Sequence, residues 1–287
     1  MFGPNSISEF SYDMRYSHRT NKFKNLYKNC KELILKKFDL SEYDLIFAPG
    51  SGTTGMEIVI SSLKDKIQVT GNEGKFKTRW FEYAKNNDKY NKNSNLNLFC
   101  QLETSTGEVH YEEAGIVDAI SSFPYYKIPK DTKCFVTCSN KQLGAFPGLA
   151  LIFVRKDSWN IFEKKDYFCT KDIMLYKKYS EENQTPTTCP VQIFSQLKKV
   201  LKSFNVKSHR KKINKNCDMV SSTVKINNDM PCPVINFSKK EIPKKIAFKY
   251  ELYNHNNEKK IYQIFSYSNK TKKYKQLLKD IKNAKRY

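Results

Sequence analysis

Short apolar segments of strand length alternate with segments of helical periodicity over the first 190 residues of this chain. The apolar segments lie in YDLIFA, KIQVTG, NLFCQLE, GIVDAI, KCFVTC and LALIFV, and helical patterns occur at 20–38, in GSGTTGMEIVISSL and in GKFKTRWFEYAKNN. Several strand segments are continuously apolar, as expected of strands that are buried on both faces. The pattern predicts an α/β fold, in which helices cover both faces of a mostly parallel sheet.

The pattern of apolar and polar residues changes after Pro190. VQIFSQLKKVLKSF has the pattern of an amphipathic helix, PVINFS, KIAFKYELYN and KIYQIFSYS alternate like strands, and KKYKQLLKDIKNAKR predicts a final helix. We therefore expect a large domain over residues 12–190 and a smaller α+β domain over 191–287. The N-terminal segment 1–11 is a candidate addition to the smaller domain. A chain of 287 residues is long enough for both.

The net charge of +22 first suggests a nucleic-acid binder. However, the sequence contains no C2H2 finger, basic zipper or RNP-type aromatic motif, and its lysines occur along the whole chain, often beside asparagine. We interpret the charge as a solvated basic surface, with affinity for polyanions as a secondary property, and we do not expect nucleic acid as the main partner.

The eight cysteines lie among apolar residues and form no CxxC pair, which is typical of a reduced intracellular protein. None of the four histidines stands at ligand spacing from them, so no metal site is expected. There is no signal-peptide pattern at the start of the sequence and no apolar run of membrane-spanning length. A cytoplasmic location without membrane contact is the expectation.

The segment FAPGSGTTGMEIV predicts a strand, a glycine turn at residues 50–54 and the start of a helix. A helix N-terminus offers unpaired N–H groups and a positive dipole end, and glycine lets a ligand approach the backbone closely. Ser51, Gly52 and Thr53 are thus candidates for phosphate binding. The alternative is an N-capped turn without a ligand. The segment is not a Walker motif, because no GK[ST] follows.

Two ionisable residues follow other predicted strands. Asp118 ends an apolar run, where a carboxylate requires a partner: a lysine, a helix cap, a metal or a protonated ring nitrogen. Lys141 follows KCFVTC, at the edge of the sheet where ligands bind, although a solvated loop lysine is the simpler reading. A phosphate site, an acid and an amine, each at a strand end, are together the groups that pyridoxal phosphate requires.

A set of motifs extends in order over residues 3–190: GPNSIS, SHRTNKF, GSGTTGMEI, NEGKFKTR, ETSTGEV, VDAISSFPYYKI, SNKQLGAFPGLALIFV and NQTPTTCP. In this order they resemble the class V branch of fold-type I pyridoxal-phosphate aminotransferases, and are most similar to 2-aminoethylphosphonate and serine–pyruvate (alanine–glyoxylate) transaminases. The resemblance implies a homodimer with shared active sites. It also implies ping-pong transamination, through a Schiff base of Lys141, between a small amino acid or aminophosphonate and a 2-oxo acid or aldehyde.

The resemblance also assigns roles to individual residues. It implies that Lys141 forms the Schiff base and that Asp118 pairs with the pyridinium nitrogen. The other implied cofactor contacts are phosphate binding by Ser51, Gly52, Thr53 and Asn140, ring stacking by Phe76, proximity of Thr104 to the ring hydroxyl, and contact of Thr185 with the phosphate of the other subunit. Without the resemblance, core packing would explain Phe76, and turn formation would explain Thr104 and Thr185.

The sequence departs from the family in two places. The connection between ETSTG and GIVDA has only a few residues, whereas a parallel crossover needs about a dozen or more, so one helix of a shortened large domain is expected to be missing or replaced. In addition, Gln263 stands about where the family has an arginine that grips the substrate's acid group. An amide lacks the charge and the bidentate fork of a guanidinium.

His18 and Arg19 are candidates for this missing cation and for substrate binding, although a surface ion pair is an equal alternative for Arg19. A similar His-Arg pair occurs in phosphoserine aminotransferases, so a phosphoserine-type substrate is the first alternative. The second is a shortened, non-catalytic protein that keeps the fold and has a basic surface.

Overall fold

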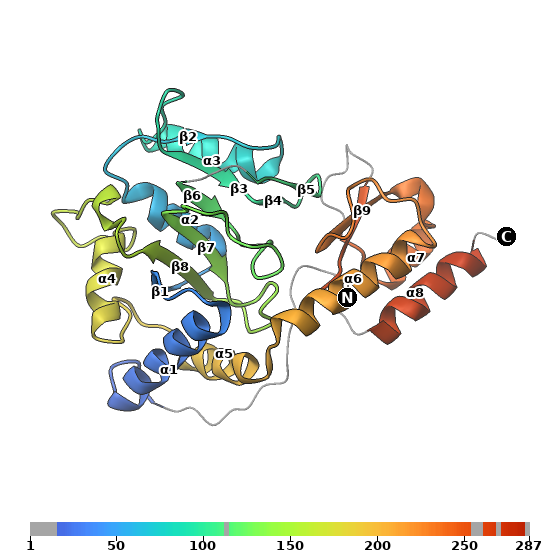
Figure 1. The fold of residues 1–287 in the computed structure, drawn as a ribbon. Coiled ribbons are helices and arrows are strands. Elements are labelled where there is room, and N and C mark those ends of the chain that lie inside the picture. Colours follow the sequence, from blue (N-terminus) through green and yellow to red (C-terminus); the bar gives the residue numbers. More distant parts are fainter. Residues whose placement is uncertain (1–15, 112–114, 254–260, 268–270, 285–287) are drawn as a thin grey trace.

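A six-stranded sheet with the strand order β1-β8-β7-β6-β3-β2 forms one half of the molecule (Figure 1). The computed structural model describes residues 16–111, 115–253, 261–267 and 271–284. The sheet consists of β1 (Tyr43–Pro49), β2 (Gln68–Val69), β3 (Asn97–Cys100), β6 (Ile116–Asp118), β7 (Cys134–Cys138) and β8 (Leu149–Arg155). Strands β2, β3, β6 and β7 are parallel to one another. Strand β8 is antiparallel to both of its neighbours, β7 and β1. The predicted mostly parallel sheet is confirmed.

Helices cover both faces of this sheet, which explains why its strands are continuously apolar. On one face, α1 (Asn21–Phe38) and α5 (Val191–Ser203) pack over the sheet in a core that includes Phe47, Phe135 and Phe153. On the other face, α2 (Gly52–Ser61), α3 (Lys75–Asn86) and α4 (Ile173–Glu181) contribute to a second core. No helix in the described part of the chain is long and apolar enough to cross a membrane.

The connection between the parallel strands β3 and β6 contains a small hairpin in place of a helix. Its strands are β4 (Leu102–Glu103) and β5 (Glu108–Val109), which pair antiparallel. No helix occurs among the described residues of this connection. The expectation that a crossover helix is missing or replaced is therefore confirmed.

The C-terminal lobe (residues 206–284) has a core of its own and lies beside the sheet (Figure 1). It contains α6 (Val206–Ser221), the antiparallel pair β9 (Val234–Ser238) and β10 (Ile261–Phe265), α7 (Lys244–Lys249) and α8 (Thr271–Ala284). Apart from Leu102, the buried residues of this core come from Ile213 onward, whereas α5 packs against α1. The domain boundary after residue 190 stays a prediction, and this packing favours a boundary between α5 and α6.

The strand predicted in KIAFKYELYN is wrong up to Lys249, because helix α7 follows Pro243, whereas Tyr253 forms an isolated antiparallel bridge to Gln263. Proline presets the backbone angle of a first helical turn and lacks an N–H group that would be unpaired there. The alternation that suggested a strand includes Phe248, which is 87% exposed, whereas the adjacent Ile246 and Ala247 are buried. Residues 1–11 and the motif GPNSIS lie outside the described residues.

Candidate active site

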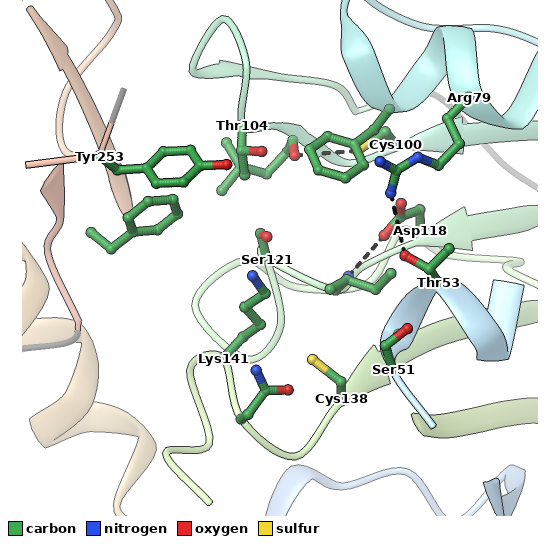
Figure 2. A pocket seen from close by; sticks show the side chains of 16 residues that line it. Ser51, Thr53, Arg79, Cys100, Thr104, Asp118, Ser121, Cys138, Lys141 and Tyr253 are labelled. Atoms are coloured by element: carbon green, nitrogen blue, oxygen red, sulfur yellow. Dashed lines mark hydrogen bonds between the residues drawn. The ribbon is translucent and has the colours of Figure 1, made fainter. Parts of the chain in front are cut away.

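A cavity of about 260 Å³ lies where the carboxyl ends of β6 and β7 meet the N-terminus of α2 (Figure 2). Ligands of α/β proteins bind at this edge of a parallel sheet, and the volume is close to that of small-ligand pockets, about 300–1,000 Å³. Every residue predicted to bind a cofactor lines the cavity except Thr185: Ser51, Gly52, Thr53, Phe76, Thr104, Asp118, Asn140 and Lys141.

The N-terminus of α2 forms one end of the cavity. Ser51 is the N-cap residue, and its Oγ accepts a hydrogen bond from the backbone N–H of Thr54, while its own N–H donates to Thr54 Oγ1. A Cβ at Gly52 would lie 2.7 Å from the Ile120 side chain, so glycine lets the helix start pack closely against the loop after β6. The unpaired N–H groups of a first helical turn suit an anion at this end.

Asp118 is buried at the end of β6, and two N–H donors fix its carboxylate. Oδ1 accepts from the backbone N–H of Ile120 at 3.0 Å, and Oδ2 accepts from Trp80 Nε1 at 2.7 Å. Burial raises the pKa of Asp118 to about 6, and these two hydrogen bonds oppose the shift. A buried carboxylate that is charged at neutral pH stabilises a cation beside it, such as a protonated ring nitrogen.

Lys141 lies in the loop after β7, on the opposite side of the cavity from Arg79 in Figure 2. Burial lowers the pKa of Lys141, while nearby Cys138 and Asp118 oppose the shift. Gln142 fixes the adjoining backbone, because its Nε2 donates to the carbonyl of Ser121 and its Oε1 lies 3.0 Å from His209 Nε2 on α6. A lysine with a lowered pKa has more of the neutral amine that can attack an aldehyde.

A buried carboxylate that the sequence analysis missed fixes the start of α3. Glu103 Oε2 accepts from the backbone N–H groups of Phe76 and Lys77, and its Oε1 accepts from the N–H and Oγ of Ser105. A carboxylate at a helix N-terminus pairs with free donors and with the positive end of the dipole. Glu103 thereby sets the position of Phe76 at the cavity wall.

Arg79 is the second residue that the sequence analysis missed. Its Nη1 donates to Thr53 Oγ1 at 3.3 Å, and its guanidinium carbon lies 5.0 Å from the centre of the Phe76 ring. The available signal was helical spacing, since a residue three positions after Phe76 lies on the same face of a helix. Tyr253 and Phe265 of the C-terminal lobe also line the cavity, and no sequence pattern pointed to them.

Gln263 lies behind the cavity wall and does not line the cavity. It is buried, and its Nε2 donates to the backbone carbonyl of Thr104 and, at 2.8 Å, to Asn236 Oδ1. The residue at the place expected of the late arginine thus supports Thr104 from behind.

His18, Arg19 and Thr185 lie away from the cavity lining. Arg19 donates to Gln184 Oε1 and to the carbonyls of Thr185 and Pro186. Thr185 is fully buried, and its hydroxyl donates to the carbonyl of Thr187. Their roles in substrate binding and in a partner's phosphate site stay predictions.

Comparisons with known proteins show what the chain and its fold are similar to. No protein-family model matches the chain. An uncharacterized aminotransferase of Methanocaldococcus jannaschii is 32% identical over 221 residues, which are 61% of this chain and 56% of that protein, so the chain spans about half of that relative. A phosphoserine aminotransferase structure from Cytophaga hutchinsonii superposes with a TM-score of 0.82 at 19% identity, over 94% of this chain and 91% of that one.

An alanine–glyoxylate aminotransferase structure from Nostoc sp. superposes with a TM-score of 0.78 at 15% identity, over 93% of this chain and 89% of that one. The chain has the fold of these aminotransferases. The predicted fold class is confirmed, and so is the resemblance from which it was drawn.

Proposed function

We propose that this chain is a pyridoxal-phosphate-dependent aminotransferase that moves an amino group between a small amino acid or aminophosphonate and a 2-oxo acid or aldehyde. The observation that carries the proposal is the meeting of Lys141, Asp118 and the N-terminus of α2 in one cavity. The aminotransferase relative and the shared fold support this class of reaction.

The residues of the cavity fit each chemical group of pyridoxal phosphate. Ser51, Gly52 and Thr53 bring the N-terminus of α2 to the cavity, and a first helical turn offers N–H groups to a phosphate. Asp118 suits a protonated ring nitrogen, Lys141 suits an aldehyde, and Phe76 provides an aromatic face for a ring. When bound, the cofactor supplies an electron sink for the substrate's α-carbon.

The protein's own residues then have distinct tasks. The amine of Lys141, with its pKa lowered by burial, would hold the cofactor through its aldehyde carbon, with loss of water, until the substrate's amine takes its place on that carbon. The Lys141 amine freed in this way would take a proton from the substrate's α-carbon and return it. Asp118, charged above about pH 6, keeps a ring nitrogen protonated, and the N–H groups of Trp80 and Ile120 hold the carboxylate in place.

A homodimer and a cytoplasmic location belong to the same proposal. The dimer is supported by the resemblance, which implies a role for Thr185 at the phosphate of the other subunit. The location is supported by the cysteines, because all eight are free and seven of them are buried. Reduced, buried cysteines are typical of intracellular proteins.

The test is an absorbance spectrum of the purified protein with pyridoxal phosphate, followed by borohydride reduction and peptide mass spectrometry. We expect a covalent band and a reduced adduct on Lys141, with both lost in Lys141→Ala. The matched control is Lys130→Ala, an exposed lysine outside the cavity, which should behave like the wild type. A panel of amino donors, followed as loss of the band, would then identify the substrate. The absence of a band in the wild type would contradict the proposal.

A further inference from the structure

Two cationic residues, Lys141 and Arg79, are found among the described residues that line the cavity, and they lie at opposite ends of it (Figure 2). Lys141 lies near Ser121, whereas Arg79 reaches from α3 toward Thr53 at the start of α2. On the proposed function, the amine of Lys141 is engaged with the aldehyde. Arg79 is therefore the cation that remains at the α2 end.

Contacts from two elements hold the guanidinium of Arg79. Its Nη1 donates to Thr53 Oγ1 on α2, and its charged centre lies over the rings of Phe76 and Trp80, at 5.0 and 6.0 Å from their centres. Both α3 aromatics are fixed in turn, Phe76 by the Glu103 cap and Trp80 by its hydrogen bond to Asp118. The guanidinium is thus positioned before any ligand binds.

Within the described residues, one acceptor is found for the donors of this guanidinium. An arginine has five N–H donors, and within the described part of the chain Thr53 Oγ1 is the acceptor for one of them. No described carboxylate lies within ion-pair distance of Arg79, although its side chain is partly buried and its charge acts on Asp118 from farther away, opposing the rise that burial causes in the pKa of that carboxyl. A cation with spare donors beside a helix N-terminus is matched to an anion with several oxygens.

We propose that Arg79 supplies the counter-charge for the phosphate of the bound cofactor, and thereby makes the cavity prefer pyridoxal phosphate over pyridoxal. A phosphate monoester brings about 1.5 to 2 negative charges at neutral pH into a cavity that already contains the Asp118 carboxylate. The α2 dipole offsets only about half a charge. The remaining donors of the Arg79 fork would be available to the phosphate, and the Thr53 hydroxyl, which accepts from Arg79, would have its own proton left to donate.

This inference rests on the proposed function, and its test compares two ligands that differ only in the phosphate. Binding of pyridoxal phosphate and of pyridoxal is measured by absorbance titration for the wild type, Arg79→Gln, Arg79→Lys and Lys75→Gln. Lys75 is an exposed lysine on the same helix, so Lys75→Gln is the matched control for loss of one charge.

In Arg79→Gln we expect affinity for pyridoxal phosphate to fall about 10- to 100-fold, the range of a charged hydrogen bond, and affinity for pyridoxal to change less than about threefold. Arg79→Lys, which keeps the charge and loses the fork, should be intermediate, and Lys75→Gln should match the wild type. As a second readout, inorganic phosphate should raise the melting temperature of the cofactor-free wild type and not that of Arg79→Gln.

Equal losses for the two ligands in Arg79→Gln would overturn the inference, because they would mean that Arg79 only supports Phe76 and Thr53. Unchanged affinity for both ligands would overturn it as well. If the wild type itself forms no adduct with either ligand, the proposed function fails, which is a different result from failure of the Arg79 assignment alone.

Discussion

The two walls of the cavity differ in chemistry. The wall built by the sheet and its helices carries Asp118, Lys141 and Arg79, together with the hydroxyls at the start of α2. The wall from the C-terminal lobe presents the aromatic rings of Tyr253 and Phe265, whose centres are 6.1 Å apart. The first wall has a charge or a donor for each group of a cofactor. The second, over its described residues, offers aromatic surface and one polar group, the Tyr253 hydroxyl (Figure 2).

The described lining from the C-terminal lobe contains no Lys or Arg, although the C-terminal part of the chain is the more basic one. Residues 191–287 contain 24 Lys and Arg against 6 Asp and Glu, whereas residues 1–190 contain 27 against 23. The described lysines of α8 lie on its exposed side, while the residues it buries are Tyr274, Leu277, Leu278 and Ile281. This charge produces a long-range electrostatic field that favours anionic substrates. None of the described Lys and Arg residues after 190 lines the cavity.

The largest effect is expected on the rate of amino transfer, when the charge of Asp118 is removed from the charged wall. Asp118→Asn removes the charge that keeps a ring nitrogen protonated, so the rate of amino transfer should fall by about 10²- to 10⁴-fold. Single-turnover conversion with an amino donor measures this directly. Asp131→Asn, a substitution of a carboxylate that pairs at the surface with Arg155, is the control and should retain the wild-type rate. Retention of the rate in Asp118→Asn would mean that the charged wall does not act through this carboxylate.

The charged wall was largely predictable from the sequence, and the aromatic wall was not. Ser51, Asp118 and Lys141 each follow an apolar run, and the ends of parallel strands converge at one edge of the sheet, so local pattern was enough to bring them together. Tyr253 and Phe265 reach the cavity through the packing of a separate lobe, which leaves no periodic signal. Arg79 and Glu103 were visible as residues, but their roles depend on three-dimensional contacts of α3, with Thr53 of α2 for Arg79 and with the end of β4 for Glu103.

The same reasoning explains the wrong strand at α7. Alternation of Ile246, Phe248 and Tyr250 indicates a strand only if the alternate residues share one environment, and Phe248 is exposed whereas Ile246 is buried. The neighbouring proline decides for a helix. A short segment whose pattern fits both a helix and a strand takes the conformation that its tertiary packing favours, and the sequence alone does not show that packing.

A moderate effect on stability, with little effect on the cofactor, is expected at Gln263 behind the aromatic wall. Gln263→Met keeps the volume but removes the donors to the Thr104 carbonyl and to Asn236 Oδ1, so the free energy of unfolding should fall by about 1–3 kcal/mol. Cofactor affinity should stay within about threefold of the wild type, because Gln263 does not line the cavity. Urea unfolding and absorbance titration measure the two quantities.

The control for this substitution is Gln276→Met, which removes an exposed hydrogen bond to Asp280 on α8 and should cost less than about 0.5 kcal/mol. A rise in the Michaelis constant for carboxylate donors, without loss of stability, would instead mean that Gln263 contacts the substrate. The aromatic wall would then have a second polar group beside the Tyr253 hydroxyl.

The smallest expected effect is on the free energy of unfolding, which the charge of Asp118 lowers when no cofactor cation lies beside it. The pKa of Asp118 is raised to about 6 in the folded protein, so between its ordinary value of 3.8 and about 6 the folded state binds a proton more tightly than the unfolded state. Stability from this group is therefore fully present at low pH and is lost as pH rises through about 6. From pH 8 to pH 5, the cofactor-free wild type should gain roughly 1 kcal/mol relative to Asp118→Asn, as measured by urea unfolding. Parallel pH profiles would show that the carboxylate is already compensated in the empty cavity, and the difference between the walls would then lie in shape more than in charge.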